Sequence, residues 1–230
     1  MYRLDKLVAK ALDISRKQAS KLVRSGKVLV DKQVEKSSNR TLSNRDSVEY
    51  DGQRLVFPTN SYILLNKPKG YICSTKDEDH PSALNLLNMP STKGYHFAGR
   101  LDVDTTGLVL ISNDGQWTHR ITSPKNKKAK VYRVLLDSEI TQEMVAKLEK
   151  GVLLRDSSKA TAPSKVETID LKAIKLSITE GRYHQVKRML AAVGNRVIEL
   201  HRESIGVIGI DDSVQLGEWR ELDPSEIDSF

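Results

Sequence analysis

Ala98–Leu110, which reads Ala-Gly-Arg-Leu-Asp-Val-Asp-Thr-Thr-Gly-Leu-Val-Leu, is the stretch that says most about the fold and chemistry of this chain. It sets an Arg, two acids, two hydroxyls and two glycines among apolar residues, and it runs directly into the apolar segment Leu108–Ile111. That density of polar side chains is unusual for a plain structural turn. Three catalytic or metal-binding patterns match it, and the rest of the chain has to choose among them.

A calcium-binding loop is the first pattern. Asp102, Asp104 and Thr106 would occupy loop positions one, three and five, with Gly107 at the sharp turn. Position twelve should be a bidentate Glu, but it is Asn113, and no pair of helices flanks the stretch. This pattern is therefore disfavoured.

A phosphatase motif, Asp-x-Asp-x-Thr, is the second pattern. An aspartyl nucleophile is aimed from the end of a buried strand, whereas the preceding segment His96–Arg100 is short and ends in a charge. The later pair Asp211–Asp212 could serve a magnesium ion. The third pattern depends on other segments of the chain and is described below. The alternative to any catalytic or metal-binding pattern is a capped structural turn, in which Asp and Thr form hydrogen bonds with their own backbone and Gly107 takes a positive φ.

Charge is distributed unevenly along the 230 residues. The chain carries 37 Lys and Arg against 30 Asp and Glu, a net charge of +7. Residues 1–58 hold 13 basic and 7 acidic residues, whereas residues 59–230 hold 24 and 23. A basic chain of ordinary apolar content indicates an anionic partner, most often nucleic acid, and the excess places that contact in the N-terminal quarter.

Cysteine usage and hydropathy indicate the compartment. Cys73 is the single cysteine, which excludes an intramolecular disulfide and fits a reducing cytoplasm. The start of the chain lacks the apolar core of a signal peptide, and no run approaches the roughly 18 apolar residues of a membrane span. We expect a cytoplasmic protein without a membrane partner.

Residues 1–58 predict a small module of two helices and short strands. Leu4, Leu7, Val8 and Ala11 share one helix face, and Ser15–Gln18 reads as a capping box that opens a second helix. The second helix carries its cations on the side opposite its apolar residues; they are Arg16, Lys17, Lys21 and Arg24. A strand is expected at 27–30, followed by a turn at Asp31–Lys32 and then Val34, and a last short strand is expected at 46–50.

This arrangement resembles the small RNA-binding module of ribosomal protein S four, and the resemblance implies that the four cations contact RNA phosphates. A solvated basic helix face is the alternative interpretation. Residues 54–60 are predicted to form the linker, because Pro58 breaks strand pairing.

Three further segments narrow the choice for residues 61–230. Ser61–Tyr71 predicts a strand that ends in a Pro-Gly turn and contains Asn-Lys-Pro-x-Gly; an ordinary turn with a solvated Lys67 is the alternative. The basic run Lys125–Lys130 leads into a strand that carries Tyr132. Arg182–Leu190, with the sequence Arg-Tyr-His-Gln-Val-Lys-Arg-Met-Leu, predicts a helix capped by Gly194.

In that predicted helix, Tyr183, Val186, Leu190 and Val193 share the buried face, and Lys187 lies at its edge. A strand is expected next, over residues 196–202. Taken by itself, His184 indicates a surface or hydrogen-bonding residue rather than a base or a metal ligand.

Together these segments resemble the pseudouridine synthases, specifically the bacterial branch that modifies small-subunit (16S) rRNA and carries an N-terminal RNA-binding module. Gly-Arg-Leu-Asp followed by Asp-Thr-x-Gly-Leu, the Asn-Lys-Pro-x-Gly turn and Gly-Arg-x-His-Gln-Val-Lys-Arg-Met carry the resemblance. It implies that Asp102 is the catalytic residue and that Lys187 pairs with it and keeps it ionised. The resemblance and the chemistry of the target together assign the other expected site residues: for the substrate pocket Arg100, Tyr132, Lys187 and Leu200; for RNA contact Lys127 and Lys128 besides the four N-terminal cations.

The expected reaction detaches uracil from ribose, rotates it and rejoins it through carbon 5. It needs no redox step, so we expect no cofactor and no metal, and the chain has no Gly-x-Gly-x-x-Gly or Walker motif. We expect an α+β protein: an α/β RNA-binding module at 1–58, and a catalytic domain at 61–230 with a mixed, mainly antiparallel sheet flanked by helices and crossed by the cleft that holds Asp102. The expected partner is 16S rRNA in an assembling small subunit, and the expected state is a monomer. A synthase of large-subunit rRNA and a non-enzymatic ribosome assembly factor are the alternatives.

Overall fold

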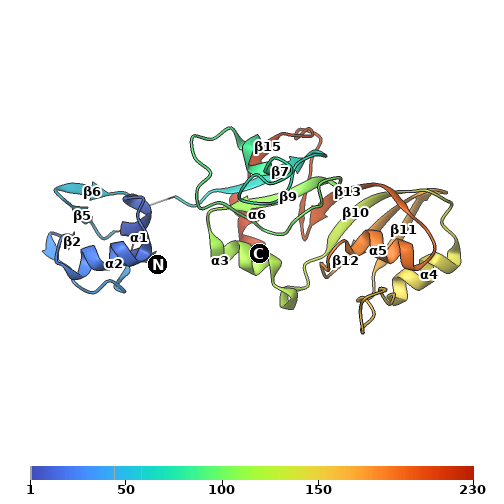
Figure 1. The fold of residues 1–230 in the computed structure, drawn as a ribbon, viewed down its shortest axis with the longest axis horizontal. Helices are drawn as coiled ribbons and strands as arrows, with labels where there is room; N and C mark the ends of the chain where they lie inside the picture. The colour runs from blue at the N-terminus through green and yellow to red at the C-terminus, as the bar shows by residue number, and fades with distance from the viewer. Residues whose placement is uncertain (1, 44, 58) are drawn as a thin grey trace. The chain divides into compact units, whose positions relative to one another are not determined.

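Separate hydrophobic cores form in the two units into which the chain divides, Met1–Asn60 and Ser61–Phe230 (Figure 1). The computed structural model describes residues 2–43, 45–57 and 59–230. Among these residues, every helix is too short or too polar to span a bilayer.

The N-terminal unit consists of two helices and a small antiparallel sheet. Helices α1 (Leu4–Ala11) and α2 (Arg16–Arg24) bury Leu4, Leu7, Ala19 and Val23. Ser15 Oγ accepts from the Gln18 amide and Gln18 Oε1 accepts from the Ser15 amide, so the predicted capping box opens α2. The sheet has the order β3-β2-β5-β6, with bounds Gln33–Val34, Val28–Val30, Val48–Tyr50 and Gln53–Leu55. A separate pair joins β1 (Tyr2–Arg3) to β4 (Thr41–Leu42).

The linker prediction for residues 54–60 is wrong at its start. Arg54 and Leu55 belong to β6, and Leu55 is buried. The chain turns back between β5 and β6 at Asp51–Gly52, where both residues have positive φ, as in a type I′ hairpin. The Asp-Gly pair was the available signal for this hairpin. Pro58, on which the prediction rested, lies outside the described residues.

The C-terminal unit is built on one mixed sheet. In the described chain this sheet has nine strands, and its main path runs β11-β12-β10-β13-β9-β7-β15. Only the β13–β9 pairing is parallel among the registers described, so the expected mixed, mainly antiparallel sheet is confirmed. The strand bounds are β7 Tyr62–Lys67, β8 His96–Phe97, β9 Thr106–Ser112, β10 Lys130–Leu136, β11 Lys165–Asp170, β12 Ala173–Ile178, β13 Val197–Ile205, β14 Ile208–Gly209 and β15 Trp219–Glu221.

Helices flank this sheet (Figure 1). Their bounds are α3 Gly115–Thr122, α4 Gln142–Lys150, α5 Gln185–Ala192 and α6 Pro224–Asp228, with 3₁₀ turns η1 Ala83–Leu87 and η2 Pro124–Asn126. One core packs α5 and η1 against β9, β10, β12 and β13, and a second packs α3 against the other face of β7 and β9. Because β7 and β9 are covered on both faces, they read as continuous apolar runs such as Leu108–Ile111.

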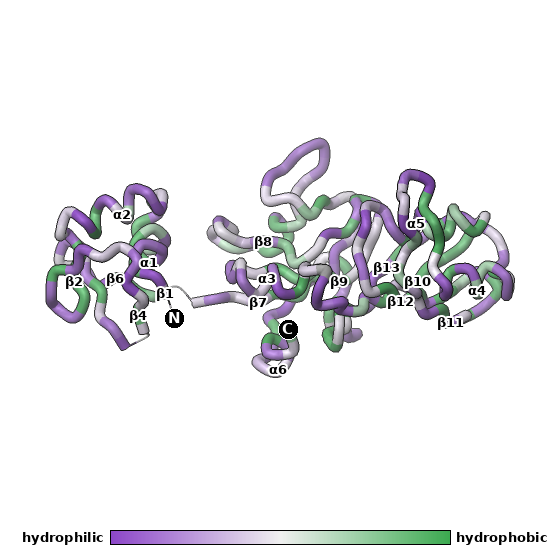
Figure 2. The backbone as a smooth tube through the Cα atoms, turned by 90° about the horizontal axis from the view of Figure 1, so that it is seen from below, coloured by the Kyte–Doolittle hydropathy of each residue, from purple (hydrophilic) through white to green (hydrophobic). Residues whose placement is uncertain are grey.

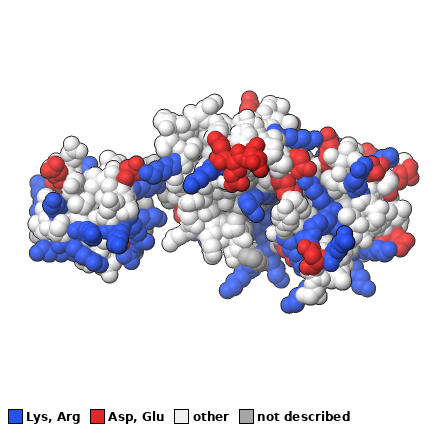
Figure 3. Space-filling model, viewed as in Figure 1, with Lys and Arg blue, Asp and Glu red and all other residues white. Residues whose placement is uncertain are grey.

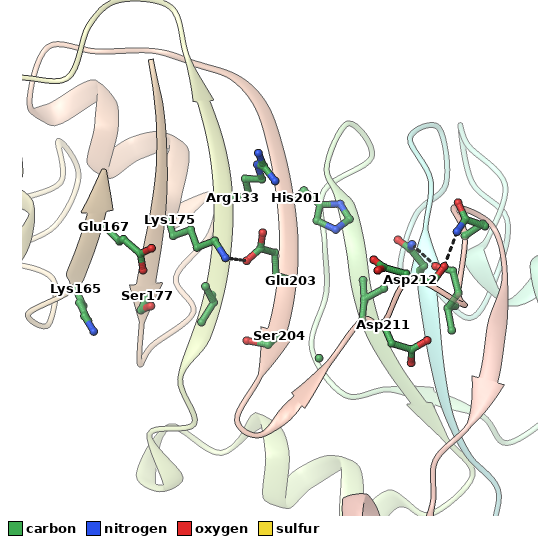
Figure 4. Close-up of a pocket in the computed structure, with 16 residues that line it drawn as sticks. Arg133, Lys165, Glu167, Lys175, Ser177, His201, Glu203, Ser204, Asp211 and Asp212 are labelled. Carbon is green, nitrogen blue, oxygen red and sulfur yellow. Dashed lines mark hydrogen bonds and ion pairs between the residues drawn. The ribbon is translucent and has the colours of Figure 1, made fainter. Parts of the chain in front are cut away.

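The strands β10, β12 and β13 instead alternate, because one of their faces is open to solvent. Tyr132, Leu176 and Leu200 point into the core, whereas Arg133, Lys175, His201 and Glu203 line a polar groove on the other face (Figure 4). The alternation of inward and outward side chains along β10, β12 and β13 decides which residues of each strand can take part in a site on the α5 side. In Figure 2 the loops that project from the sheet are mostly hydrophilic.

Candidate active site

Asp102 lies in the loop that enters β9. The loop is closed by a turn in which the Thr105 amide donates to the Asp102 carbonyl at 3.1 Å, and the Gly70 amide donates to the Val103 carbonyl at 2.8 Å. The Asp102 side chain is 27% exposed and lines a cleft of about 930 Å³. The sequence-predicted residues Arg100, Tyr132, Lys187 and Leu200 line the same cleft.

Two side chains from the chain around α5 reach the Asp102 carboxylate. Lys187 Nζ lies 3.0 Å from Asp102 Oδ2 and 2.6 Å from Asp104 Oδ1, so one ammonium bridges both acids. His184 Nε2 lies 3.4 Å from Asp102 Oδ1, and it forms an ion pair only when protonated. The contact between Lys187 and Asp102, separated by 85 residues, is the one that the family resemblance implied.

The Lys187 ammonium also occupies the position that a metal would need between Asp102 and Asp104. In the part of the chain that the structure describes, no group of three or more His, Cys, Asp or Glu side chains could hold a metal ion. Asp211 and Asp212 line the groove of Figure 4, not the cleft that holds Asp102. Neither the calcium loop nor the phosphatase pattern therefore has its ligands.

Burial by itself opposes the charge on Lys187, but its hydrogen bonds with Asp104 and Asp102 outweigh that cost and raise the pKa of Lys187 above its ordinary value. Burial likewise opposes charge on Asp104, and the hydrogen bond and charge of Lys187 nevertheless lower the pKa of Asp104. Both shifts favour the charged forms, so the bridge persists through the neutral range.

Tyr132 and Leu200 form the apolar wall of the cleft. Tyr132 on β10 and Leu200 on β13 are 7% and 6% exposed, so both line the cleft while they remain almost wholly buried. Arg100, in contrast, is exposed at the start of the Asp102 loop. An aromatic ring, an aliphatic side chain and a carboxylate around one opening suit a flat, uncharged ring such as a nucleobase.

Arg202 is a site residue that the sequence analysis did not single out. It is 2% exposed; Nε donates to the Leu108 carbonyl at 2.7 Å and Nη1 to the Arg100 carbonyl at 3.3 Å. One guanidinium thus holds both ends of the loop that carries Asp102. Strand parity was the available signal, because Arg202 follows Leu200 by two positions and so shares its inward face.

Lys67 is buried in the structure and is not exposed to solvent. The alternative of a solvated Lys67 is wrong, because the side chain is 0% exposed and Nζ donates to the carbonyls of Pro68 and Tyr71 at 2.9 and 2.8 Å. Burial lowers the pKa of Lys67. Its ammonium braces the Pro-Gly turn, whose Gly70 amide in turn supports the Asp102 loop.

The two predicted RNA-contacting lysines of the basic run before β10 lie in different environments. Lys127 is exposed in the turn between η2 and β10. Lys128 lines the cleft, but its Nζ donates to the Ser229 carbonyl at 2.8 Å and lies 4.8 Å from the centre of the Phe230 ring. Lys128 is therefore partly engaged by the C-terminus, whereas Lys127 is presented to solvent.

The helix predicted from Arg182 begins later, at Gln185. His184 has a left-handed backbone (φ +47°), and the Gln185 side chain accepts from the Arg182 amide at 2.8 Å. These local bonds turn the chain before the helix starts. As a result Tyr183, predicted to be buried, is 71% exposed and lines the cleft, while the predicted core positions Val186 and Leu190 are buried.

The Asp104–Lys187 bridge predicts a pH-dependent stability. A carboxyl whose pKa is lowered by folding stabilises the fold above its ordinary pKa of about 3.9, and this contribution is lost as the pH falls through the lowered value. We expect wild type to have a higher melting temperature than Asp104→Asn at pH 7, and this difference in melting temperature to vanish below about pH 4. The corresponding difference in the free energy of unfolding is less than about 1 kcal/mol, because the Asp104 side chain is 64% exposed.

Thermal melting of both proteins from pH 3 to pH 8 measures this difference. Asp51→Asn is the control, because Asp51 is an exposed turn residue in the other unit and Asn accepts its positive φ. A melting difference for Asp104→Asn that stays constant over the whole range would contradict the assignment.

Comparisons with known proteins find matches to both units of the chain. The model of the RNA pseudouridylate synthase family matches residues 61–192, and that of the S4 domain matches residues 3–48. The chain is 49% identical over 229 residues to "Ribosomal small subunit pseudouridine synthase A" of Vibrio parahaemolyticus, covering 99% of this chain and 98% of that protein. It is 48% identical over 228 residues to the Salmonella typhimurium protein of the same name, covering 99% of each.

A solved structure, "Crystal structure of pseudouridylate synthase", superposes with a TM-score of 0.72 at 42% sequence identity, covering 100% of this chain and 99% of that one. The match extends over both units, and the family model spans the Asp102 loop, β10 and α5. The chain therefore belongs to the RNA pseudouridylate synthase family and carries an N-terminal S4 domain.

Proposed function

We propose that this protein converts one uridine of small-subunit (16S) rRNA to pseudouridine, with Asp102 as the catalytic residue. The observation that carries the proposal is the placement of the Asp102 carboxylate in a cleft beside Tyr132 and Leu200, held by Lys187 at 3.0 Å. The small-subunit target is supported by the names of relatives that align along 99% of this chain.

The isomerisation breaks the bond between uracil N1 and ribose C1′ and forms one between uracil C5 and C1′. The hydrogen on C5 leaves as a proton, and one proton ends on N1, so no oxidant or reductant takes part. A carboxylate serves such a reaction either as a nucleophile or as the base that removes a proton. The bridge from Lys187 fixes the carboxylate, and Tyr132 and Leu200 enclose the ring while it turns.

The target base has to leave its stack to reach Asp102, at a cost of about a few kcal/mol. Contacts to the phosphate backbone offset this cost. Arg100 is exposed beside Asp102, where its guanidinium can hold the backbone or fill the gap left by the flipped nucleotide. Exposed Lys127 and the partly engaged Lys128 provide further positive charge on the catalytic unit.

The S4 domain supplies a second, sequence-independent contact. Lys17, Lys21 and Arg24 are exposed on α2. In Figure 1, α2 lies along the lower side of the N-terminal unit, and Figure 3 shows Lys and Arg gathered on that side in the same view. Arg16 is also exposed, but its Nη2 lies 3.2 Å from Asp5 Oδ1, and the Asp5 side chain is 5% exposed. Arg16 therefore also holds α2 to α1, which separates its role from those of the other three.

Neutralising Lys17, Lys21 and Arg24 together to Gln is expected to weaken RNA binding without unfolding the domain. If each contacts one phosphate, the slope of log affinity against log salt falls by roughly 0.7 to 0.9 per contact, about 2 to 3 in total. Binding titrations at several salt concentrations measure the slope. Arg16→Gln alone is the matched comparison, and it should also lower thermal stability because Arg16 pairs with Asp5. An unchanged salt slope in the triple variant would remove α2 from the RNA interface.

Tritium release from rRNA labelled at carbon 5 of uridine tests the proposed function, because forming the C5–C1′ bond expels that hydrogen. We expect release from 16S rRNA, with chelator present and without a cofactor. Parallel reactions contain naked 16S rRNA, a partly assembled small subunit and large-subunit rRNA. Release only from large-subunit rRNA would support the alternative substrate, and binding without release from any of them would support an assembly factor.

We also propose that the protein acts as a monomer in the cytoplasm, on an assembling small subunit. The single cysteine, Cys73, fits a reducing compartment. Comparing the rates on naked RNA and on the partly assembled particle decides which substrate form is preferred.

A further inference from the structure

Tyr183 is an exposed aromatic ring on the rim of the cleft that holds Asp102. It is 71% exposed, although it lies in a segment whose neighbours are held by hydrogen bonds. Tyrosine combines a large apolar ring with a polar hydroxyl and is enriched at binding interfaces, so an exposed tyrosine on the rim of a cleft is well placed to contact a ligand. The chemistry described so far gives this ring no role.

Local hydrogen bonds hold Tyr183 in place. Arg182, the preceding residue, donates to Ser157 Oγ at 3.1 Å and to the Ala160 carbonyl at 2.7 Å. Arg188 Nη1 donates to the Tyr183 carbonyl at 2.9 Å. The ring is therefore presented from an anchored backbone, so that little conformational entropy is lost when something binds to it.

The next residue links the ring to the catalytic carboxylate. The His184 ring stacks on that of Tyr183, with centroids 3.7 Å apart and planes at 22°. His184 Nε2 in turn lies 3.4 Å from Asp102 Oδ1. His184 adopts a left-handed backbone that a non-glycine residue rarely takes, a form of strain found at functional sites. His184 thus covers one face of the tyrosine ring, and the other face is open.

We propose that the open face of Tyr183 is a stacking platform for the base of a nucleotide next to the target uridine. This inference rests on the proposed function, because flipping one base out of a stack leaves its neighbours without a partner on one side. An aromatic ring replaces that partner for any base, since every base has a flat π face. Tyr183 then contacts RNA outside the reacting ring, beside the carboxylate that reacts.

Replacing Tyr183 tests the platform. Tyr183→Ala is expected to raise both the Kd for 16S rRNA and the KM for tritium release by about 5- to 150-fold, with kcat at saturating RNA changed much less. Tyr183→Phe keeps the ring and should bind like wild type. Tyr183→Leu keeps apolar bulk without a π face and should resemble Ala. Leu171→Ala is the control, because Leu171 is 66% exposed in the turn between β11 and β12.

Abasic RNA identifies the stacked nucleotide. A fragment of 16S rRNA around the uridine that wild type modifies is prepared with the base removed at each flanking position in turn. At the stacked position the abasic fragment binds wild type and Tyr183→Ala equally, whereas at the other positions the difference persists. The proposal would be overturned if Tyr183→Ala bound 16S rRNA as tightly as wild type, or if Tyr183→Leu bound it as tightly as Tyr183→Phe.

Binding and turnover separate the two levels of inference. Binding of 16S rRNA that depends on the Tyr183 ring, with no tritium release by wild type from any rRNA, would reject the proposed function while retaining an RNA-stacking surface. Tritium release by wild type with no dependence of Kd or KM on the ring would retain the function and reject the platform.

Discussion

Asp102→Asn is expected to lower kcat/KM for tritium release by at least about 10³-fold, while the Kd for rRNA stays within about twofold of wild type. An amide matches the shape of the carboxylate but is neither a nucleophile nor a base of useful strength. The fold should survive, because Lys187 keeps its 2.6 Å contact with Asp104 and is not left as a partly buried charge without a partner.

Single-turnover tritium release and an equilibrium binding titration on the same RNA measure the two effects of Asp102→Asn. Asp104→Asn is the matched control, because it removes the other carboxylate that contacts Lys187. The Asp104 side chain is 64% exposed, and this variant should retain activity within about tenfold. Turnover by Asp102→Asn near the wild-type rate would move the chemistry to another group. A loss of RNA binding equal to the loss of turnover would make Asp102 a binding residue.

Gly107→Ala is expected to destabilise the catalytic unit by more than about 4 kcal/mol. Gly107 is the second residue of β9, has φ +108° and pairs with Arg202 in the parallel register of β9 and β13. A Cβ here would lie 2.3 Å from the Arg202 carbonyl oxygen, too close for any packed atom. The backbone of Arg202 cannot move away without separating the two strands and loosening the Asp102 loop that its guanidinium holds.

Urea denaturation followed by tryptophan fluorescence measures this effect, because both tryptophans, Trp117 and Trp219, lie in the catalytic unit. Gly99→Ala is the matched control: its φ is +95°, but no atom lies within 4 Å of the added Cβ, so it reports the cost of the backbone conformation alone. Equal destabilisation by the two variants would mean that the close approach of β9 to β13 is unimportant.

Much of the fold followed from short-range patterns. The capping box at Ser15–Gln18, the alternation in β12 and the apolar run at Leu108–Ile111 each depend on residues within a few positions of one another. The motifs likewise placed Asp102 and Lys187 in one site by resemblance. Errors arose where a local bond outweighed the hydrophobic period, as at His184, whose left-handed turn delays α5 and exposes Tyr183.

By itself, then, the sequence determined the family, the two-part organisation, the type of most elements and the identity of the candidate carboxylate, because caps, turns and strand alternation are local and motifs are read directly. Only the tertiary structure decided how the parts of the site meet. The parallel register of β9 and β13 sets Arg202 opposite Gly107, so that the Arg202 guanidinium forms hydrogen bonds with both ends of the Asp102 loop. The same register leaves no space for a Cβ at position 107 and therefore requires a glycine there. Lys187 reaches Asp102 across 85 residues because sheet pairing and helix packing bring them together, and such long-range contacts leave no periodic signal in the chain.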